Sequence, residues 1–187
     1  KLNKMRFYME NNLDVKQFYQ PDPIIRKGVE DLMIDAGNLP RVIYHLQEKN
    51  PDKFELLKEV YKNLFPDIED IIVERYEINT RNNPNLPAEI PFVISNAIHV
   101  LYVKDKNLAH LVDFTVMSDG AKRVFMILTR IILADVANIS LIAIEEPENS
   151  VHPGLMQSYI RIISQLLDDC KIIIKSHSPY IVSYLEP

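Results

Sequence analysis

In the last third of the chain, two short apolar runs are each followed by side chains that could carry phosphate chemistry. Glu145 and Glu146 follow the apolar run 141–144, and His177 stands shortly after a second apolar run at 172–174. Adjacent carboxylates can hold Mg²⁺ and accept a proton from an attacking water. A histidine can donate a hydrogen bond to a phosphate oxygen or polarise that water. These residue types therefore predict a magnesium–phosphate site, provided that the two runs lie side by side.

A third group, Ser118-Asp119-Gly120, precedes a long apolar segment. Serine followed by an acidic residue is typical of a helix N-cap, and backbone N–H groups at a helix start favour an anion. Gly120 would also let a phosphate approach the backbone closely. Taken alone, each of the three groups is more often structural than catalytic, so the prediction depends on their order along the chain.

The elements around these residues indicate an α/β fold. The runs 141–144 and 172–174 are short and wholly apolar, as expected for central strands covered on both faces. Between them, apolar residues at helical spacing (Leu155, Tyr159, Ile162, Ile163 and Leu166) predict an amphipathic helix. Strand, helix and strand in this order predict a right-handed crossover between parallel neighbours. The carboxyl ends of such strands meet at one edge, where ligands bind.

The remaining segments predict a mixed organisation. Residues 1–37 are polar and irregular, and we expect a connecting region there with one short helix. Apolar spacing and turn residues then predict helices over 38–48 and 51–64, strands over 68–78, 92–103 and 108–116, and a buried helix over 124–137. The strands 92–103 and 108–116 would form a hairpin around residues 104–107.

Composition narrows the class of protein. The 187 residues are 47% hydrophobic and 25% charged, with a net charge of −5, which disfavours a wholly basic nucleic-acid-binding surface. The single cysteine, Cys170, cannot form an internal disulfide, and no apolar run is long enough to span a membrane. We therefore expect a cytoplasmic protein. Since the chain begins at Lys1 and has only four glycines, we also expect a fragment of a longer protein.

Two longer motifs carry a family resemblance. Residues 145–153 read Glu-Glu-Pro-Glu-Asn-x-x-His-Pro, and residues 176–180 read Ser-His-Ser-Pro-Tyr. With them, the segment 38–187 resembles the C-terminal half of the ABC-type AAA ATPases of the OLD (overcoming lysogenization defect), SMC and DNA-repair groups. The resemblance implies a P-loop NTPase-like parallel-sheet lobe at 117–187, with a helical insertion and a β-hairpin at 38–116.

The resemblance also implies ATP and Mg²⁺ as cofactors and assigns a role to each motif. Glu145 would be the Walker B acid that holds the metal, Glu146 the catalytic glutamate and His177 the switch histidine. Residues assigned to nucleotide contacts come from the signature loop and the D-loop: Ser118, Asp119, Gly120, Asn149, Ser150 and His152.

Three departures from the common pattern stand out. The Walker B acid is Glu145 where Asp is commoner, and the signature reads Ser-Asp-Gly-Ala-Lys. The third departure is larger, because no Gly-x-x-x-x-Gly-Lys-Ser/Thr phosphate loop occurs. We expect an N-terminal P-loop lobe to be supplied from outside this sequence, and this chain alone to be inactive. The resemblance further implies a homodimer or higher oligomer and leaves a nucleic acid or an effector nuclease open as a partner.

Other classes of function remain as alternatives. A hydrolase would pair Ser178 or Cys170 with His177, but there is no nucleophile elbow and no evident orienting acid. A Toprim-type nuclease needs an Asp-x-Asp motif, which does not occur in this sequence. A metal site built from Glu145, Glu146, His152 and His177 is a further alternative. The strongest rival is a scaffold lobe that completes a partner's nucleotide site without hydrolysis.

Overall fold

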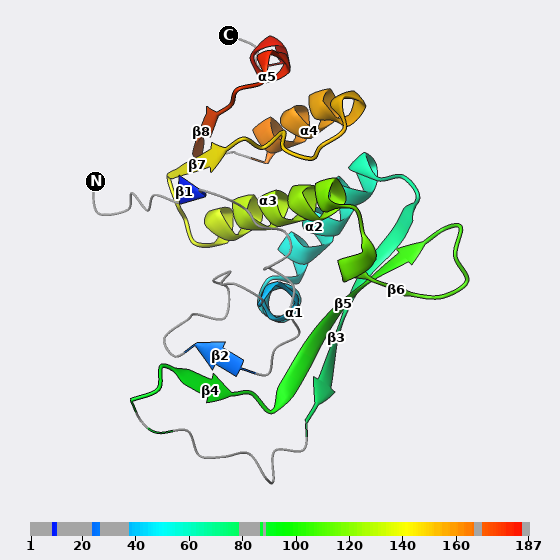
Figure 1. Ribbon diagram of the computed structural model, residues 1–187, viewed down its shortest axis with the longest axis vertical. Coiled ribbons are helices and arrows are strands. Elements are labelled where there is room, and N and C mark those ends of the chain that lie inside the picture. The colour runs from blue at the N-terminus through cyan, green and yellow to red at the C-terminus, as the bar shows by residue number, and fades with distance from the viewer. Residues whose placement is uncertain are drawn as a thin grey trace. The chain divides into compact units, whose positions relative to one another are not determined.

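A computed structural model describes residues 9–10, 24–26, 38–78, 87, 89–166 and 170–184, the first two ranges by their backbone alone. The chain divides into two compact units (Figure 1). The first unit comprises Lys1–Val15, Leu56–Pro66 and Met117–Pro187, and the second comprises Lys16–Glu55 and Asp67–Val116. The helix predicted within 1–37 lies outside the described residues.

A three-stranded parallel sheet forms the base of the first unit, in the order β1 (Met9–Glu10), β7 (Leu141–Glu145) and β8 (Lys171–Lys175). Figure 1 shows the three strands side by side. The prediction that the last two strands are parallel neighbours is confirmed, with Leu141 opposite Lys171 and Glu145 opposite Lys175. No strand was predicted within 1–37, whereas the structure has two short ones there, β1 and β2 (Ile24–Arg26).

Three helices accompany these strands along the chain. The helix α3 (Asp119–Val136) precedes β7, α4 (Pro153–Gln165) connects β7 to β8, and α5 (Pro179–Tyr184) follows β8. The predicted all-round burial of α3 is confirmed over most of its length. In α4 the buried stripe consists of Met156, Tyr159, Ile160 and Ile163, so it is rotated slightly from the predicted one.

The second half of α2 (Pro51–Leu64) packs on α3 within this unit. The buried Tyr61 hydroxyl donates a hydrogen bond to the carbonyl oxygen of Ala121 (3.1 Å), and the Tyr61 and Phe125 rings meet edge to face at 5.0 Å. An aromatic anchor thus fixes the first turn of α3, the turn that carries the predicted signature residues.

The second unit is built on an antiparallel sheet of β3 (Ile68–Glu77), β5 (Ala97–Asp105) and β6 (Val112–Asp113). The helix α1 (Leu39–Lys49) contacts β3 and β5, and the short 3₁₀ helix η2 (Phe114–Val116) follows β6. A separate pair joins β2 to β4 (Phe92–Ile94). The fold is therefore mixed α/β with small parallel and antiparallel sheets.

Two predicted strands of this unit are wrong in extent. The strand expected over 92–103 is divided at Ser95 and Asn96, because the Ser95 hydroxyl accepts from the Ala97 amide (3.1 Å) and turns the chain. The strand expected over 108–116 is only two residues long. Asp113 accepts from the Thr115 amide (2.8 Å), which closes a turn and starts η2. The predicted pairing of the two segments is confirmed by the antiparallel β5–β6 contact.

Within the described part of the chain, no helix is both long and apolar enough to cross a membrane.

Candidate functional site

The residues predicted to do chemistry meet at the carboxyl ends of β7 and β8. Because these strands are parallel and Glu145 is in register with Lys175, the residues that follow them, Glu146 and Ser176, leave the sheet at the same edge. His177 Nε2 lies 3.6 Å from Glu146 Oε1. The structure thus brings together the two predicted catalytic side chains, which are about thirty residues apart in sequence.

Glu146 adopts a backbone conformation that is unusual for a residue with a side chain. Its φ is +49°, in the left-handed region, which costs about 1–3 kcal/mol for a non-glycine residue. Hydrogen bonds hold it there. The Glu146 amide donates to the Lys175 carbonyl (2.6 Å), and the Asn149 amide donates to the Glu146 carbonyl (3.1 Å). The Asn149 side-chain amide also donates to Glu146 Oε2. The predicted D-loop residue Asn149 therefore orients the predicted catalytic carboxylate.

Glu145 is arranged differently from Glu146. Its carboxylate is the largely shielded partner of an ion pair with the exposed Lys175 on the neighbouring strand, and this hydrogen bond raises the pKa of Lys175. No group of three or more His, Cys, Asp or Glu among the described residues could hold a metal ion by itself. The four-residue metal site considered above has no support in this arrangement. Mg²⁺ needs fewer protein ligands, because it commonly binds through one or two carboxylates together with water and substrate phosphate.

The residues Ser118 to Gly120 form the start of α3. Ser118 is the N-cap, and its hydroxyl accepts from the Ala121 amide (3.2 Å), as predicted. Asp119 pairs with Lys122 one turn along (3.0 Å). A Cβ atom added to Gly120 would lie 2.1 Å from the Ser150 carbonyl oxygen, so packing against the D-loop segment already requires glycine here. The predicted role in phosphate approach is a separate function that this contact does not test.

The other predicted D-loop residues lie at the surface. Ser150 is exposed and has a φ of +64°, a second left-handed residue in the turn that begins with Glu146. His152 caps α4, where its Nδ1 accepts from the Gly154 amide (3.1 Å) and Pro153 occupies the first helical turn. The start of helix α4 is therefore a sufficient structural reason for the sequence His152-Pro153.

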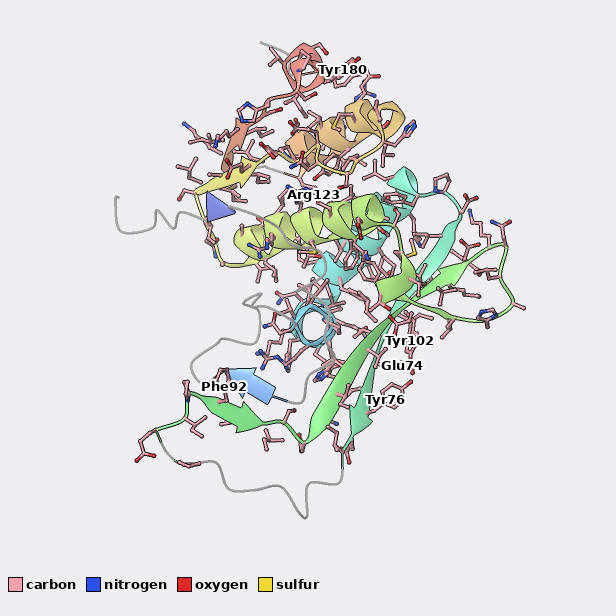
Figure 2. The ribbon with its side chains drawn as sticks, in the orientation of Figure 1. Glu74, Tyr76, Phe92, Tyr102, Arg123 and Tyr180 are labelled. Atoms are coloured by element: carbon pink, nitrogen blue, oxygen red, sulfur yellow. The ribbon has the colours of Figure 1, made fainter. Side chains whose placement is uncertain are left out.

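The structure also shows two polar side chains whose roles the sequence did not indicate. Arg123, labelled on α3 in Figure 2, is only 6% exposed and donates to the carbonyl oxygens of Glu145 (3.2 Å) and Glu146 (2.8 Å). Glu148 accepts a hydrogen bond from the Ser176 hydroxyl, which in turn accepts from the Ser178 amide (2.9 Å). The turn after β7 is thus tied both to α3 and to the segment that carries His177.

The hydrolase alternative receives no support. Cys170 precedes β8 and His177 follows it, so the whole length of the strand separates them. The Ser178 amide bonds to Ser176 as part of the turn into α5. The arrangement instead presents a carboxylate, a histidine and two serines at one sheet edge, which suits activation of water beside a phosphate group.

Comparisons with known proteins identify a family for this chain. Residues 6–183 match a protein family described as "AAA domain, putative AbiEii toxin, Type IV TA system". The chain belongs to this AAA-domain family. The family generally implies ATPase activity with ATP and Mg²⁺, and the carboxylates at the end of β7 are chemically suited to such a substrate.

Solved structures with a similar fold include SMC head domains. One, described as "Crystal structure of the SmcHead bound to the C-winged helix domain of ScpA", has a TM-score of 0.56 and 11% identity, covering 92% of this chain and 48% of that one. A second, from "Structural biochemistry of ATP-driven dimerization and DNA stimulated activation of SMC ATPases", has a TM-score of 0.50 and 8% identity, covering 77% and 78%.

This AAA-domain chain thus spans about half the length of the first SMC head. At these identities the likeness shows the P-loop NTPase fold alone. A search among curated proteins finds no significant match.

Proposed function

We propose that this chain is the C-terminal lobe of an ABC-type ATPase related to the OLD and SMC groups. It supplies the signature residues, the Walker B acid, the catalytic glutamate and the switch histidine. The observation that carries the proposal is the juxtaposition of Glu146 and His177 at the carboxyl ends of two parallel strands, 3.6 Å apart. A P-loop segment from outside this sequence completes the nucleotide site.

Glu146 is the general base in this proposal. Its carboxylate accepts a proton from the water that attacks the γ-phosphate of ATP, giving ADP and inorganic phosphate. Asn149 donates to one carboxylate oxygen, and His177 stands beside the other. His177 is 78% exposed in its side chain and can therefore donate a hydrogen bond to the γ-phosphate.

Glu145 would hold Mg²⁺, directly or through water, and the ion would neutralise phosphate charge when bound. For this role Glu145 would exchange its ion pair with Lys175 for the metal. The pair is open to solvent on its Lys175 side and contributes little, so the exchange is inexpensive.

The open side of β8 supports the proposed position of the P-loop segment. Among the described residues, β8 pairs only with β7, and Ile173 on it is 50% exposed. A further strand could pair along this edge and extend the sheet beside the carboxylates.

The output of hydrolysis is proposed from the family description and the resemblance. Coupling to phage defence or to DNA repair fits the groups that the motifs resemble, and the toxin–antitoxin wording of the family favours defence. The rival proposal, a scaffold lobe without hydrolysis, differs in one measurable respect: nucleotide would change the assembly without release of phosphate.

The test is ATP hydrolysis by the full-length protein, in which we expect the P-loop segment that completes the site. Glu146→Gln should lower kcat by about 100-fold or more while ATP binding is retained, because the change removes a base and keeps the shape of the side chain. Glu89→Gln, at an exposed position of the second unit, is the matched control and should leave kcat unchanged. Glu146→Gln turning over at the parental rate would show that another carboxylate is the base, and a parent without phosphate release would support the scaffold.

A further inference from the structure

A buried arginine lies beneath the turn that carries the proposed base. Arg123 projects from α3 and is 6% exposed, and its Nη2 donates to the carbonyl oxygens of Glu146 (2.8 Å) and Glu145 (3.2 Å). Figure 2 labels it on α3. A guanidinium bound to two successive carbonyls fixes the path of the backbone between them. Arg123 therefore contacts the two residues on which the proposed chemistry depends without being exposed to a substrate.

A charge at this position needs compensation from its surroundings. Burial lowers the pKa of Arg123, and the nearby Tyr159, Glu146 and Glu148 oppose this effect. Within the described part of the chain, the Tyr159 hydroxyl and Glu148 Oε2 are buried and have no hydrogen-bond partner. The surroundings are thus polar, and an apolar side chain in place of Arg123 would remove one donor from each of the Glu145 and Glu146 carbonyls.

The backbone that Arg123 holds is the strained one. Glu146 has a φ of +49°, and such a conformation persists only where the surrounding structure enforces it. Its carbonyl oxygen accepts from the Arg123 side chain and from the Asn149 amide. If the arginine is removed, Glu146 can relax by rotation about its N–Cα bond toward an ordinary φ. That rotation would turn the Cα–Cβ bond and move the carboxylate away from His177.

We propose that Arg123 is a positioning residue that sets the Glu146 carboxylate for catalysis. This inference rests on the proposed function of Glu146 as the base. Arg123 acts through backbone geometry and contacts neither nucleotide nor water. Since Arg123 lies five residues after Ser118, it also joins the start of α3 to the acidic turn, so the two parts of the site share one support.

The experiment is a double-mutant cycle in the full-length protein, measured as ATP hydrolysis with ATP binding measured separately. Arg123→Met should lower kcat by about 10- to 100-fold, the loss expected when a reacting group is displaced by about an ångström, while KM changes by less than about threefold. Arg123→Lys keeps the charge and one donor nitrogen, and should restore part of kcat. Arg130→Met, on the same helix, is the control and should retain parental kcat.

The decisive measurement is the same substitution in a Glu146→Gln background. If Arg123 acts through Glu146, Arg123→Met should lower the residual rate by no more than about twofold there. An equal loss in both backgrounds, or a parental kcat in Arg123→Met, would overturn the proposal. Should Arg123→Met fail to fold, Arg123→Lys in the two backgrounds gives the same comparison. Failure of the proposed function looks different, because Glu146→Gln alone would then leave hydrolysis unchanged.

Discussion

Gly120 shows at the residue scale that one position can serve both packing and a predicted binding role. A methyl group at this position would lie 2.1 Å from the Ser150 carbonyl oxygen, a backbone atom that cannot move without its turn. Gly120→Ala should therefore lower the free energy of unfolding by about 1–3 kcal/mol, as overpacking does. The measurement is urea denaturation of the purified protein.

Gly154 provides the comparison for this prediction. A Cβ added there would lie 3.2 Å from the His152 ring, a side chain that can shift, and alanine favours the helix. Gly154→Ala should change the free energy of unfolding by less than about 1 kcal/mol. Equal effects of the two substitutions would mean that the contact with Ser150 is not the cause.

At the scale of elements, α1 and the β3–β5 pair of the second unit enclose a histidine. His99 on β5 is opposite Arg75 on β3, and its ring lies 4.8 Å from the Tyr44 ring on α1. Burial, followed by the charges of His45, Arg75 and Arg41, lowers the pKa of His99 to about 4. An unfolded histidine takes up its proton near pH 6.5, so between these two pH values only the unfolded chain binds the proton.

Stability should therefore fall as the pH decreases through the window from about 6.5 to 4, and this contribution should be fully present above it. Because His99 is only partly buried, we expect an effect on the order of 1 kcal/mol. His99→Gln should reduce the difference in free energy of unfolding between pH 7.5 and pH 4.5. His110→Gln, an exposed histidine of the same unit, should not. An unchanged pH dependence in His99→Gln would contradict the assignment.

At the scale of the whole molecule, we predict a dimer with shared active sites. The signature residue Ser118 would complete the site whose P-loop belongs to the other subunit. Mixing a P-loop-defective variant with Ser118→Arg should then restore about a quarter of parental hydrolysis, because half of the exchanged dimers are mixed and each keeps one intact site.

The matched control is a mixture of the P-loop-defective variant with Glu146→Gln. In the shared-site arrangement, the P-loop and Glu146 of one subunit serve the same active site. Each of the two sites in this mixed dimer therefore carries one defect, and no activity should return. Recovery in the control, or none in the first mixture despite demonstrated subunit exchange, would refute the shared-site arrangement.

The sequence predicts those parts of the site that depend on strand order. The apolar runs ending at Ile144 and Ile174 indicated two parallel strands, and parallel pairing alone brings Glu146 near His177. Arg123 was missed because an arginine on a helix is usually solvent-exposed, and only the tertiary structure shows its carbonyl partners. Charge alone does not single it out in the sequence, because α3 also carries Lys122 and Arg130.

Short strands were the other failure. The strand Met9–Glu10 is only two residues long and pairs through its backbone, so it leaves no periodic pattern. The break at Ser95 likewise depends on one hydroxyl that accepts a backbone amide. Neither the pairing of Met9–Glu10 nor the Ser95 hydrogen bond leaves a pattern of apolar residues in the sequence, so hydrophobic periodicity does not predict them.

The outer strand β8 has a consequence for how the chain behaves in solution. Lys171, Ile173 and Lys175 are its exposed residues, so an apolar side chain stands between two positive charges on a strand whose outer edge no described strand pairs with. Open edges recruit strands from other molecules, and flanking lysines oppose this by mutual repulsion. Because Lys175 shares its charge with Glu145 in an ion pair, the repulsion comes chiefly from Lys171, and salt that screens it should favour edge-to-edge aggregation.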